Sequence, residues 1–170
     1  ELVAIDVASG TRRTLLSEDR MDYTAGPVSP DGRTVAVVVE PHTTPTSAYR
    51  CEVHLLDVET GQLRRLAPAW DRMPHPEAWL PDGSALLVTA DDAGRSPVFR
   101  LDPASGEATA VTQDGAAYTD VLVSPDGAAA YALRSRLKSK VAQYTQLSSF
   151  TATQPLVPHE PARDRTKLYL

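Results

Sequence analysis

Two short turn sequences recur in step along this chain of 170 residues. One has the form x-Pro-Asp-Gly, and the other has the form Asp-x-x-Ser/Thr-Gly. The first occupies residues 29–32, 80–83 and 124–127, and the second occupies residues 6–10, 57–61 and 102–106. Both recur at intervals of roughly 44 to 51 residues. Because two independent turn signatures share one period, the sequence indicates tandem structural repeats.

Repeats of this length, built from short strands, are typical of β-propeller blades. Each repeat divides into four predicted strands. In the middle repeat we expect strands near residues 76–80, 84–89, 98–101 and 107–111, and in the preceding repeat at 34–39 and 49–56, with a longer loop at 41–48 between the last two. No helical periodicity is present before Leu137. The sequence therefore predicts an all-β fold, a partial β-propeller of about three four-stranded blades.

The residues of both turns have conformational reasons to be there. Proline at Pro30, Pro81 and Pro125 presets φ, and the glycine that ends each turn tolerates a positive φ. The aspartate of the second turn can accept hydrogen bonds from backbone N–H groups that follow it. The alternative, that these aspartates bind a metal, does not fit the ligand spacing of a calcium loop. The turn interpretation is therefore preferred.

The repeats also suggest where the units begin and end. Residues 1–6 resemble residues 52–57 and 97–102, which lie in the middle of a repeat. We therefore expect an incomplete first blade, a chain that begins partway through it, and a longer parent protein. The predicted organisation is a partial propeller at 1–137, followed at 138–170 by a strand remnant near 141–145 and an irregular, proline-rich tail.

Composition narrows the expected partners and compartment. The net charge of −5 gives no electrostatic reason to expect nucleic acid. No stretch approaches the roughly 20 apolar residues that cross a bilayer, so we expect no membrane partner. The single cysteine, Cys51, cannot form an internal disulfide, and no secretory leader is visible at the start. A cytoplasmic protein is the expectation.

A search for catalytic and cofactor-binding residues assigns none. No Gly-x-Ser-x-Gly elbow occurs, and the nearest segment, 94–98, lacks the second glycine. Cys51 begins a predicted strand without an indicated charged partner, which favours a structural thiol over a nucleophile. No glycine-rich phosphate loop is present, so we expect no cofactor. Catalytic, cofactor-binding and metal-binding residues are all predicted to be absent from this chain.

The histidines and one acidic pair are the remaining candidates for a binding site. No two histidines have the i, i+4 spacing of a helical zinc site. His75, near Trp70 and Trp79, lies either at a propeller mouth or, as we favour, in a loop packed on a blade edge. Asp91 and Asp92 are more simply a solvated turn than a ligand-binding pair. The four histidines are His42, His54, His75 and His159.

The repeats resemble the propeller that precedes the catalytic domain in the prolyl oligopeptidase family of serine peptidases. The similarity is greatest to the dipeptidyl-aminopeptidase and acylaminoacyl-peptidase branch. The segments between the turns resemble this branch in order and spacing, over roughly residues 28 to 137. These segments are 70–72, 89–99, 117–120 and 131–135. The turn sequence also resembles TolB-like propeller repeats.

The resemblance implies a non-catalytic role for this region. It implies a C-terminal α/β-hydrolase domain that carries a Ser, Asp and His triad, and a propeller that restricts access to oligopeptides. No residue here matches the triad motifs, so none is assigned. The partners expected from it are the hydrolase domain and oligopeptide substrates. The alternatives are a TolB-like propeller fragment that docks a protein partner, and a free-standing small β protein. Open blade faces also predict either self-association through those faces or a chain that is the ordered remnant of a proteolysed protein.

Overall fold

The computed structural model describes residues 1–136, and this range contains twelve strands and no helix. No helix in that range is long and apolar enough to span a membrane. The strands are β1 (Leu2–Ile5), β2 (Arg12–Leu16), β3 (Met21–Val28), β4 (Thr34–Pro41), β5 (Glu52–Asp57), β6 (Leu63–Arg65), β7 (Pro74–Trp79), β8 (Leu86–Ala90), β9 (Val98–Leu101), β10 (Ala108–Ala110), β11 (Ala117–Val123) and β12 (Ala130–Ser135). The expectations for residues 138–170, including the strand near 141–145, lie outside the described residues.

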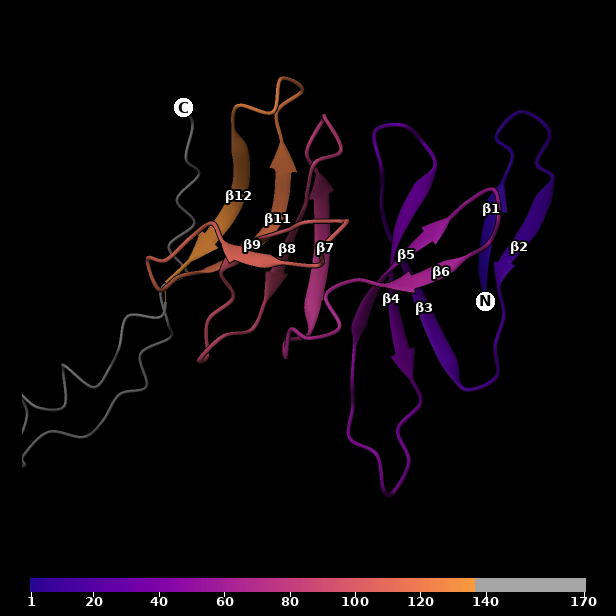
Figure 1. Ribbon diagram of the computed structural model, residues 1–170, viewed down its shortest axis with the longest axis horizontal. Coiled ribbons are helices and arrows are strands. Elements are labelled where there is room, and N and C mark those ends of the chain that lie inside the picture. The colour runs from indigo at the N-terminus through magenta and orange to yellow at the C-terminus, as the bar shows by residue number, and fades with distance from the viewer. Residues whose placement is uncertain (137–170) are drawn as a thin grey trace, which may run out of the picture.

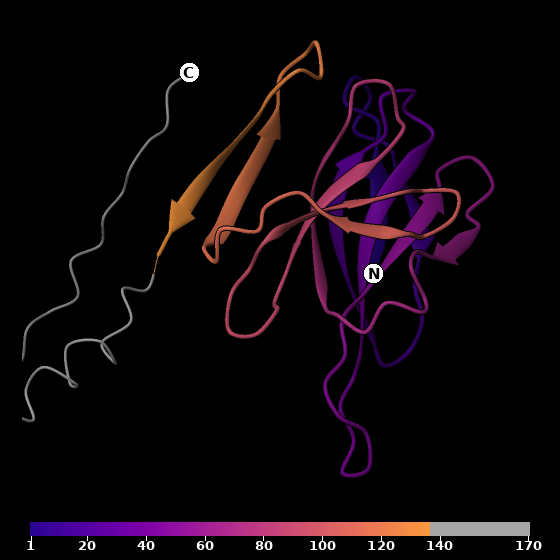
Figure 2. The ribbon, with the colours of Figure 1, turned by 60° about the vertical axis from the view of Figure 1, so that its left-hand side comes forward.

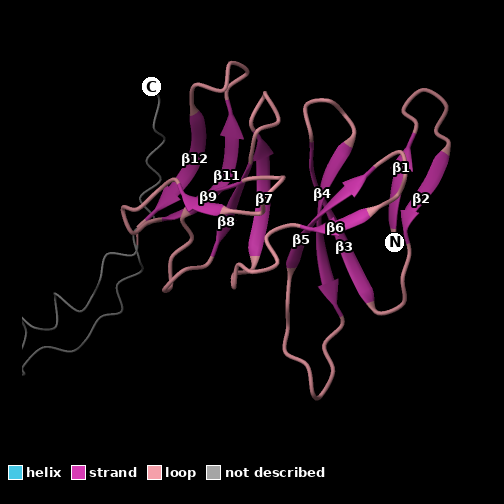
Figure 3. Ribbon diagram, in the orientation of Figure 1, coloured by secondary structure: helices cyan, strands magenta, loops and turns pink. Residues whose placement is uncertain are grey.

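The strands form four antiparallel sheets that stand side by side (Figures 1 and 3). Two are complete blades of four strands, β3 to β6 and β7 to β10, with each strand paired to the next along the chain. Two are half blades at the margins, β1–β2 and β11–β12. The predicted partial propeller is confirmed. The three expected blades appear as two whole blades and two halves.

Turn positions show which half of a blade each marginal sheet represents. The pair β1–β2 flanks the 6–10 turn, as the third and fourth strands β5 and β6 flank 57–61. The pair β11–β12 flanks the 124–127 turn, as the first and second strands β3 and β4 flank 29–32. The first half blade therefore holds the outer strands of a blade, and the last holds the inner strands.

The hydrogen bonds within the turns match the sequence expectation. The Asp57 carboxylate accepts a bond of 2.7 Å from the backbone N–H of Thr60, and Gly61 has a φ of 74°. In the other turn type, the Asp31 carboxylate accepts a bond of 3.0 Å from the N–H of Arg33. The Ser29 hydroxyl bond and then the Arg33 N–H bond lower the pKa of the Asp31 carboxyl, and the Thr60 N–H bond lowers that of Asp57. The carboxylates of both turn types therefore bond to the backbone of their own turns, as the turn interpretation expects.

Strand boundaries differ from the prediction mainly around the longer loop. The third strand of the first complete blade was expected from residue 49, but β5 begins at Glu52. The reason is a local turn in the loop, where Thr44 and Ser47 pair with each other instead of with a neighbouring strand. The β4–β5 loop therefore extends well beyond the sheet (Figure 1). The strand at Val98–Leu101 has the predicted bounds.

The main core lies between the two complete blades. Its buried residues come from β4 and β5 on one side and from β7, β8 and β9 on the other. The Trp79 indole N–H donates a bond of 3.1 Å to the carbonyl of Pro27, across the blade boundary. Gly26 lets the blades approach, since a Cβ there would lie 2.8 Å from the Ala36 carbonyl oxygen and 2.9 Å from Cγ of Pro76. This packing fixes the two blades against each other.

Candidate functional site

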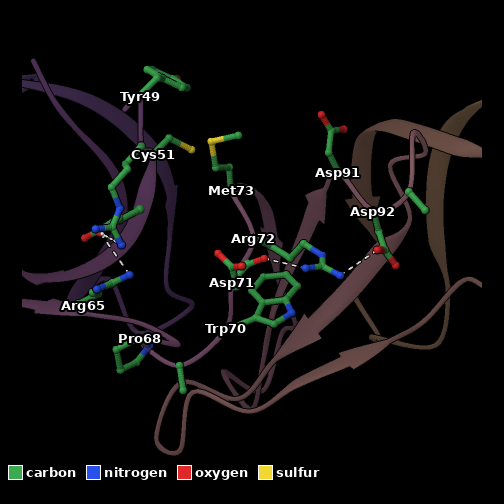
Figure 4. A pocket seen from close by; sticks show the side chains of 14 residues that line it. Tyr49, Cys51, Arg65, Pro68, Trp70, Asp71, Arg72, Met73, Asp91 and Asp92 are labelled. Carbon is green, nitrogen blue, oxygen red and sulfur yellow. Dashed lines mark hydrogen bonds and ion pairs between the residues drawn. The ribbon is translucent and has the colours of Figure 1, made fainter. Parts of the chain in front are cut away.

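A cleft of about 560 Å³ opens between the two complete blades. It lies where the end of the β4–β5 loop, the β6–β7 connection and the β8–β9 loop meet, as Figure 4 shows. These segments differ in length and sequence between the repeats, unlike the turns at the other ends of the strands. Binding residues in repeat scaffolds are commonly carried by such variable loops. The cleft is therefore the candidate site.

One wall of the cleft is organised around Glu52 at the start of β5. Its carboxylate is 3.5 Å from a guanidinium nitrogen of Arg50 and 3.2 Å from one of Arg65. The same carboxylate is 3.3 Å from Nε2 of His54. Two guanidinium groups thus share one carboxylate, so this wall has an excess of positive charge.

The opposite wall carries mostly negative charge. Arg72 from the β6–β7 connection pairs with Asp92 at 2.8 Å. The Asp91 carboxylate accepts a hydrogen bond from the Ser96 hydroxyl. Asp71 also lines the cleft beside them (Figure 4). The two walls therefore have opposite charge, an arrangement that suits a polar or zwitterionic ligand.

Trp70 gives this side of the cleft an apolar support. Its ring meets the ring of Phe99 edge-on, with the centroids 4.9 Å apart. Such edge-to-face contacts add about 0.5–1.5 kcal/mol beyond the area that they bury. The backbone N–H of Trp70 also bonds to the carbonyl of Ala67. The β6–β7 connection is thus anchored to the core that lies beneath it.

Cys51 lies at the cleft but is not arranged as a nucleophile. Its side chain is buried, and the thiol donates a hydrogen bond to the carbonyl of Pro74, with sulfur 3.8 Å from the oxygen. Burial raises the pKa of the thiol, and the nearby carboxylates of Glu40 and Glu52 raise it further. A raised pKa keeps the thiolate scarce at neutral pH. The geometry agrees with the structural interpretation made from the sequence.

The histidines lie in three different environments. His42 pairs with Asp22 at 3.2 Å in an exposed position. Burial lowers the pKa of His54 more than its bond to Glu52 raises it, and the Nδ1 atom of His54 has no hydrogen-bond partner among the described residues. His75 is an exposed residue of the inner strand β7, not part of a loop. His159 lies outside the described residues.

The loop expectation for His75 was wrong because proline on both sides of it, which is unusual within a strand, nevertheless belongs to β7. The ladder between β7 and β8 shifts register between Pro76 and Ala78. The extra residue, Glu77, accepts a bond of 2.8 Å from the Thr89 hydroxyl and one of 3.2 Å from the backbone N–H of Val121. Sequence reasoning missed this link to the next blade. A carboxylate within an otherwise apolar inner strand is the signal that pointed to it.

The acidic pair lies in a largely exposed turn, which agrees with the solvated-turn interpretation. Asp91 and Asp92 both bond to side chains of the chain, Ser96 and Arg72 respectively. Within residues 1–136, no three His, Cys, Asp or Glu side chains are grouped so that they could hold a metal ion. The cleft therefore presents paired polar groups on both walls.

Comparison with known proteins finds similarity to a curated peptidase over part of the chain. No family model matches it. Dipeptidyl-peptidase 5 of Trichophyton schoenleinii is 34% identical over 74 residues, which is 43% of this chain and 10% of the relative. The chain therefore matches about a tenth of the length of that curated relative.

Two solved structures share the fold. TolB from Acinetobacter baumannii superimposes with a TM-score of 0.59 and 23% identity, over 79% of this chain and 32% of TolB. A prolyl endopeptidase superimposes with a TM-score of 0.53 and 20% identity, over 74% of this chain and 21% of the endopeptidase. At these identities the likeness concerns the fold. Together with the sequence relative, it confirms the resemblance to a propeller domain of prolyl oligopeptidase-family peptidases.

Proposed function

We propose, from the premise that this chain is a propeller portion of the prolyl oligopeptidase type, that it controls which peptides reach a hydrolase domain. The parent enzyme would release short fragments from the amino end of oligopeptides. The observation that carries this proposal is the 34% identity over 74 residues to a dipeptidyl-peptidase. In this proposal the catalytic groups belong to the hydrolase domain of the parent enzyme.

The physical basis is a stiff wall of packed blades. The inner strands β3, β7 and β11 follow one another across the sheets, and both β3 and β11 contact β7 between them. The Trp79 bond to Pro27 and the Glu77 bond to Val121 tie neighbouring blades together. A ring of such blades admits an extended peptide but excludes a folded protein. It also keeps the reacting groups behind it out of bulk water.

The first experiment tests the isolated chain for activity. Incubation with aminoacyl and dipeptidyl chromogenic substrates should release no chromophore, because the chain lacks a nucleophile elbow. The matched positive control is intact dipeptidyl-peptidase 5. Turnover by this chain that is lost on treatment with a serine-directed inhibitor would contradict the non-catalytic assignment.

The second experiment tests the gating role in a chimaera. The segment of dipeptidyl-peptidase 5 that matches this chain is replaced by the corresponding residues of this chain, and cleavage of a dipeptide substrate is compared with that of a small folded protein. We expect the chimaera to cleave the first and spare the second. Changing Trp79→Ala should loosen the blade boundary and increase cleavage of the folded protein. The exposed turn variant Glu59→Gln serves as the control. Equal cleavage by both variants would argue against gating by the blades.

A further inference from the structure

The inner strand of each complete blade has one edge outside its sheet. β7 ends the strand order β10–β9–β8–β7, and β3 ends the order β3–β4–β5–β6. Within residues 1–136, neither strand has a ladder partner on its other side. Propeller blades surround a central channel, so these inner edges line it. An unpaired edge is a template for another extended chain, and a peptide in the channel is such a chain.

Proline removes backbone donors from the inner edge of β7. Residues 74–76 pair with residues 88–90 of β8. Because proline has no N–H, only His75 can donate to β8 in this stretch. Successive residues direct their backbone groups to opposite sides, so Pro74 and Pro76 face the free edge. The carbonyl of Pro74 is in turn occupied by the Cys51 thiol, with sulfur 3.8 Å from the oxygen. A passing chain therefore finds no N–H group at these two positions.

A β-bulge interrupts each of the three inner strands at the same place in the repeat. The bulge positions, counted three residues back from the x-Pro-Asp-Gly segment, are Gly26 in β3, Glu77 in β7 and Val121 in β11. A bulge disrupts the ladder and bends the strand, and bulges are one of the ways in which proteins protect a sheet edge from strand addition. The protection therefore belongs to the repeat and is not a peculiarity of one blade.

Side chains of β7 bond to backbone groups at the bulges on either side of it. The carbonyl of Pro27, in the bulge of β3, accepts the 3.1 Å bond from the Trp79 indole. The N–H of Val121, in the bulge of β11, donates the 3.2 Å bond to Glu77. The half blade β11–β12 stands next to the blade of β7 to β10 (Figures 1 and 2). A peptide would have to break these bonds to pair here, and such an exchange offers little net free energy.

We propose that the inner edge of β7, with the bulges beside it, is built to let an extended peptide pass without pairing with the peptide backbone. Because this wall offers no ladder, the peptide remains free to slide along it. The width of the channel and contacts with peptide side chains then decide which peptides pass. The inference rests on the proposed gating function for its biological meaning, but the closed edge itself can be measured on this chain alone.

The test restores a missing donor to the edge. Pro76→Val returns an N–H group and introduces a side chain that favours strands. Fluorescence anisotropy with a labelled hexapeptide of valine, threonine and lysine measures binding to the full chain. We expect the variant to bind this peptide about fivefold more tightly than the unaltered chain, which is the factor that one net backbone hydrogen bond supplies. Pairing elsewhere on the chain is common to both proteins and cancels in the comparison.

Two controls assign the gain to the edge of β7. Pro45→Val changes an exposed proline of the β4–β5 loop and should leave binding unchanged. A hexapeptide that is N-methylated at every residue has no backbone donor on either side, so it should bind the Pro76 variant and the unaltered chain equally. Pro74→Val restores the other donor of the same edge. It provides the same measurement if the Pro76 variant loses its strand signal in circular dichroism.

The outcomes separate this inference from the proposed function. Equal binding of the unmethylated hexapeptide by the unaltered chain and by a folded Pro76 or Pro74 variant overturns the closed edge. A gain of the same size for Pro45→Val also overturns it, because the effect would then not belong to β7. Neither result involves a hydrolase domain, so the chimaera described above remains an independent test of gating.

Discussion

The complete blades and the half blades use the same residue pattern but bury it differently. Leu101 in β9 is 0% exposed, whereas Ile5, at the same repeat position in β1, is 58% exposed. β9 pairs with both β8 and β10, whereas β1 pairs with β2 alone. The difference therefore arises from the neighbouring strands and blades and not from the type of side chain. In this repeat fold, an apolar side chain contributes to stability mainly through the strands and units that cover it, as in nearest-neighbour models of repeat proteins.

The turns show the opposite behaviour. The Asp6 carboxylate bonds to the backbone N–H of Ser9 at 2.7 Å in a half blade, and Asp57 bonds to that of Thr60 at 2.7 Å in a complete one. Both following glycines have a positive φ. The turn geometry is therefore set locally, whatever lies beside the sheet. Changes to buried side chains should therefore affect stability more than changes to the turns.

The largest loss of stability should come from truncating a buried core side chain in a complete blade. Leu101→Ala should reduce the free energy of unfolding by about 2–5 kcal/mol, because a cavity remains between the blades. The matched change Ile5→Ala should cost below about 1 kcal/mol, because Ile5 is 58% exposed. Urea unfolding followed by circular dichroism measures both. Equal losses would mean that the neighbouring blade does not determine the contribution.

The sequence was sufficient for the parts of the fold that are local or periodic. The turns at 29–32 and 57–61 have their own signatures, and the strand at Val98–Leu101 has β-branched and aromatic residues at its core-facing positions. These features predicted the blades and their order. The bulge at Glu77 was not predicted, because its bonds to Thr89 and Val121 depend on strands that are distant in sequence.

Most of the candidate cleft could not be predicted from the sequence. Glu52 lies two residues from Arg50 and two from His54, but a strand and a turn separate it from Arg65. Arg72 and Asp92 come from loops of different strands. Nothing in the spacing of these residues marks them as neighbours. Only the stacking of blades brings them together, and charged residues in loops are otherwise typical of a solvated surface.

The second largest effect concerns the close approach of the complete blades. Gly26→Ala should lower the free energy of unfolding by about 1–3 kcal/mol, because the new methyl group would overlap the Ala36 carbonyl and Pro76. Combining it with Pro76→Ala should recover part of the loss, since one of the two obstacles is removed. Thermal unfolding of the two single variants and the double variant measures the coupling. Simple additivity would show that the blades do not meet at this point.

A pH effect should distinguish the two complete blades from each other. His54 and Phe99 hold the same repeat position, and burial lowers the pKa of His54 below its ordinary value. The unfolded chain, with a histidine pKa near about 6.5, therefore binds a proton more readily than the folded chain. The contribution of His54 to stability is full at higher pH and is lost as the pH falls below about 6.5 towards the lowered folded pKa.

The variant His54→Phe should remove this pH dependence. Between about pH 7 and pH 5, its stability should change less than that of the unaltered chain, because the unfavourable protonation of a buried ring no longer occurs. Glu52 and Arg65 face the same ring, so Arg65→Gln serves as a control that alters charge but keeps the histidine. Unfolding midpoints in urea across this range provide the measurement. Identical pH profiles for the chain and the His54 variant would place the titrating group elsewhere.

The smallest loss of stability should be the same in a half blade and in a complete blade. Asp57→Ala and Asp6→Ala each remove the carboxylate that bonds to the backbone of a turn. The two turns have the same geometry and are held by local hydrogen bonds. We therefore expect both variants to lower the melting temperature slightly and by the same amount. Both effects should fade as the pH falls below about 4, where the unaltered carboxylates become protonated and lose these hydrogen bonds. A much larger loss for Asp57 than for Asp6 would indicate that turn formation is coupled to the packing of the adjacent blade.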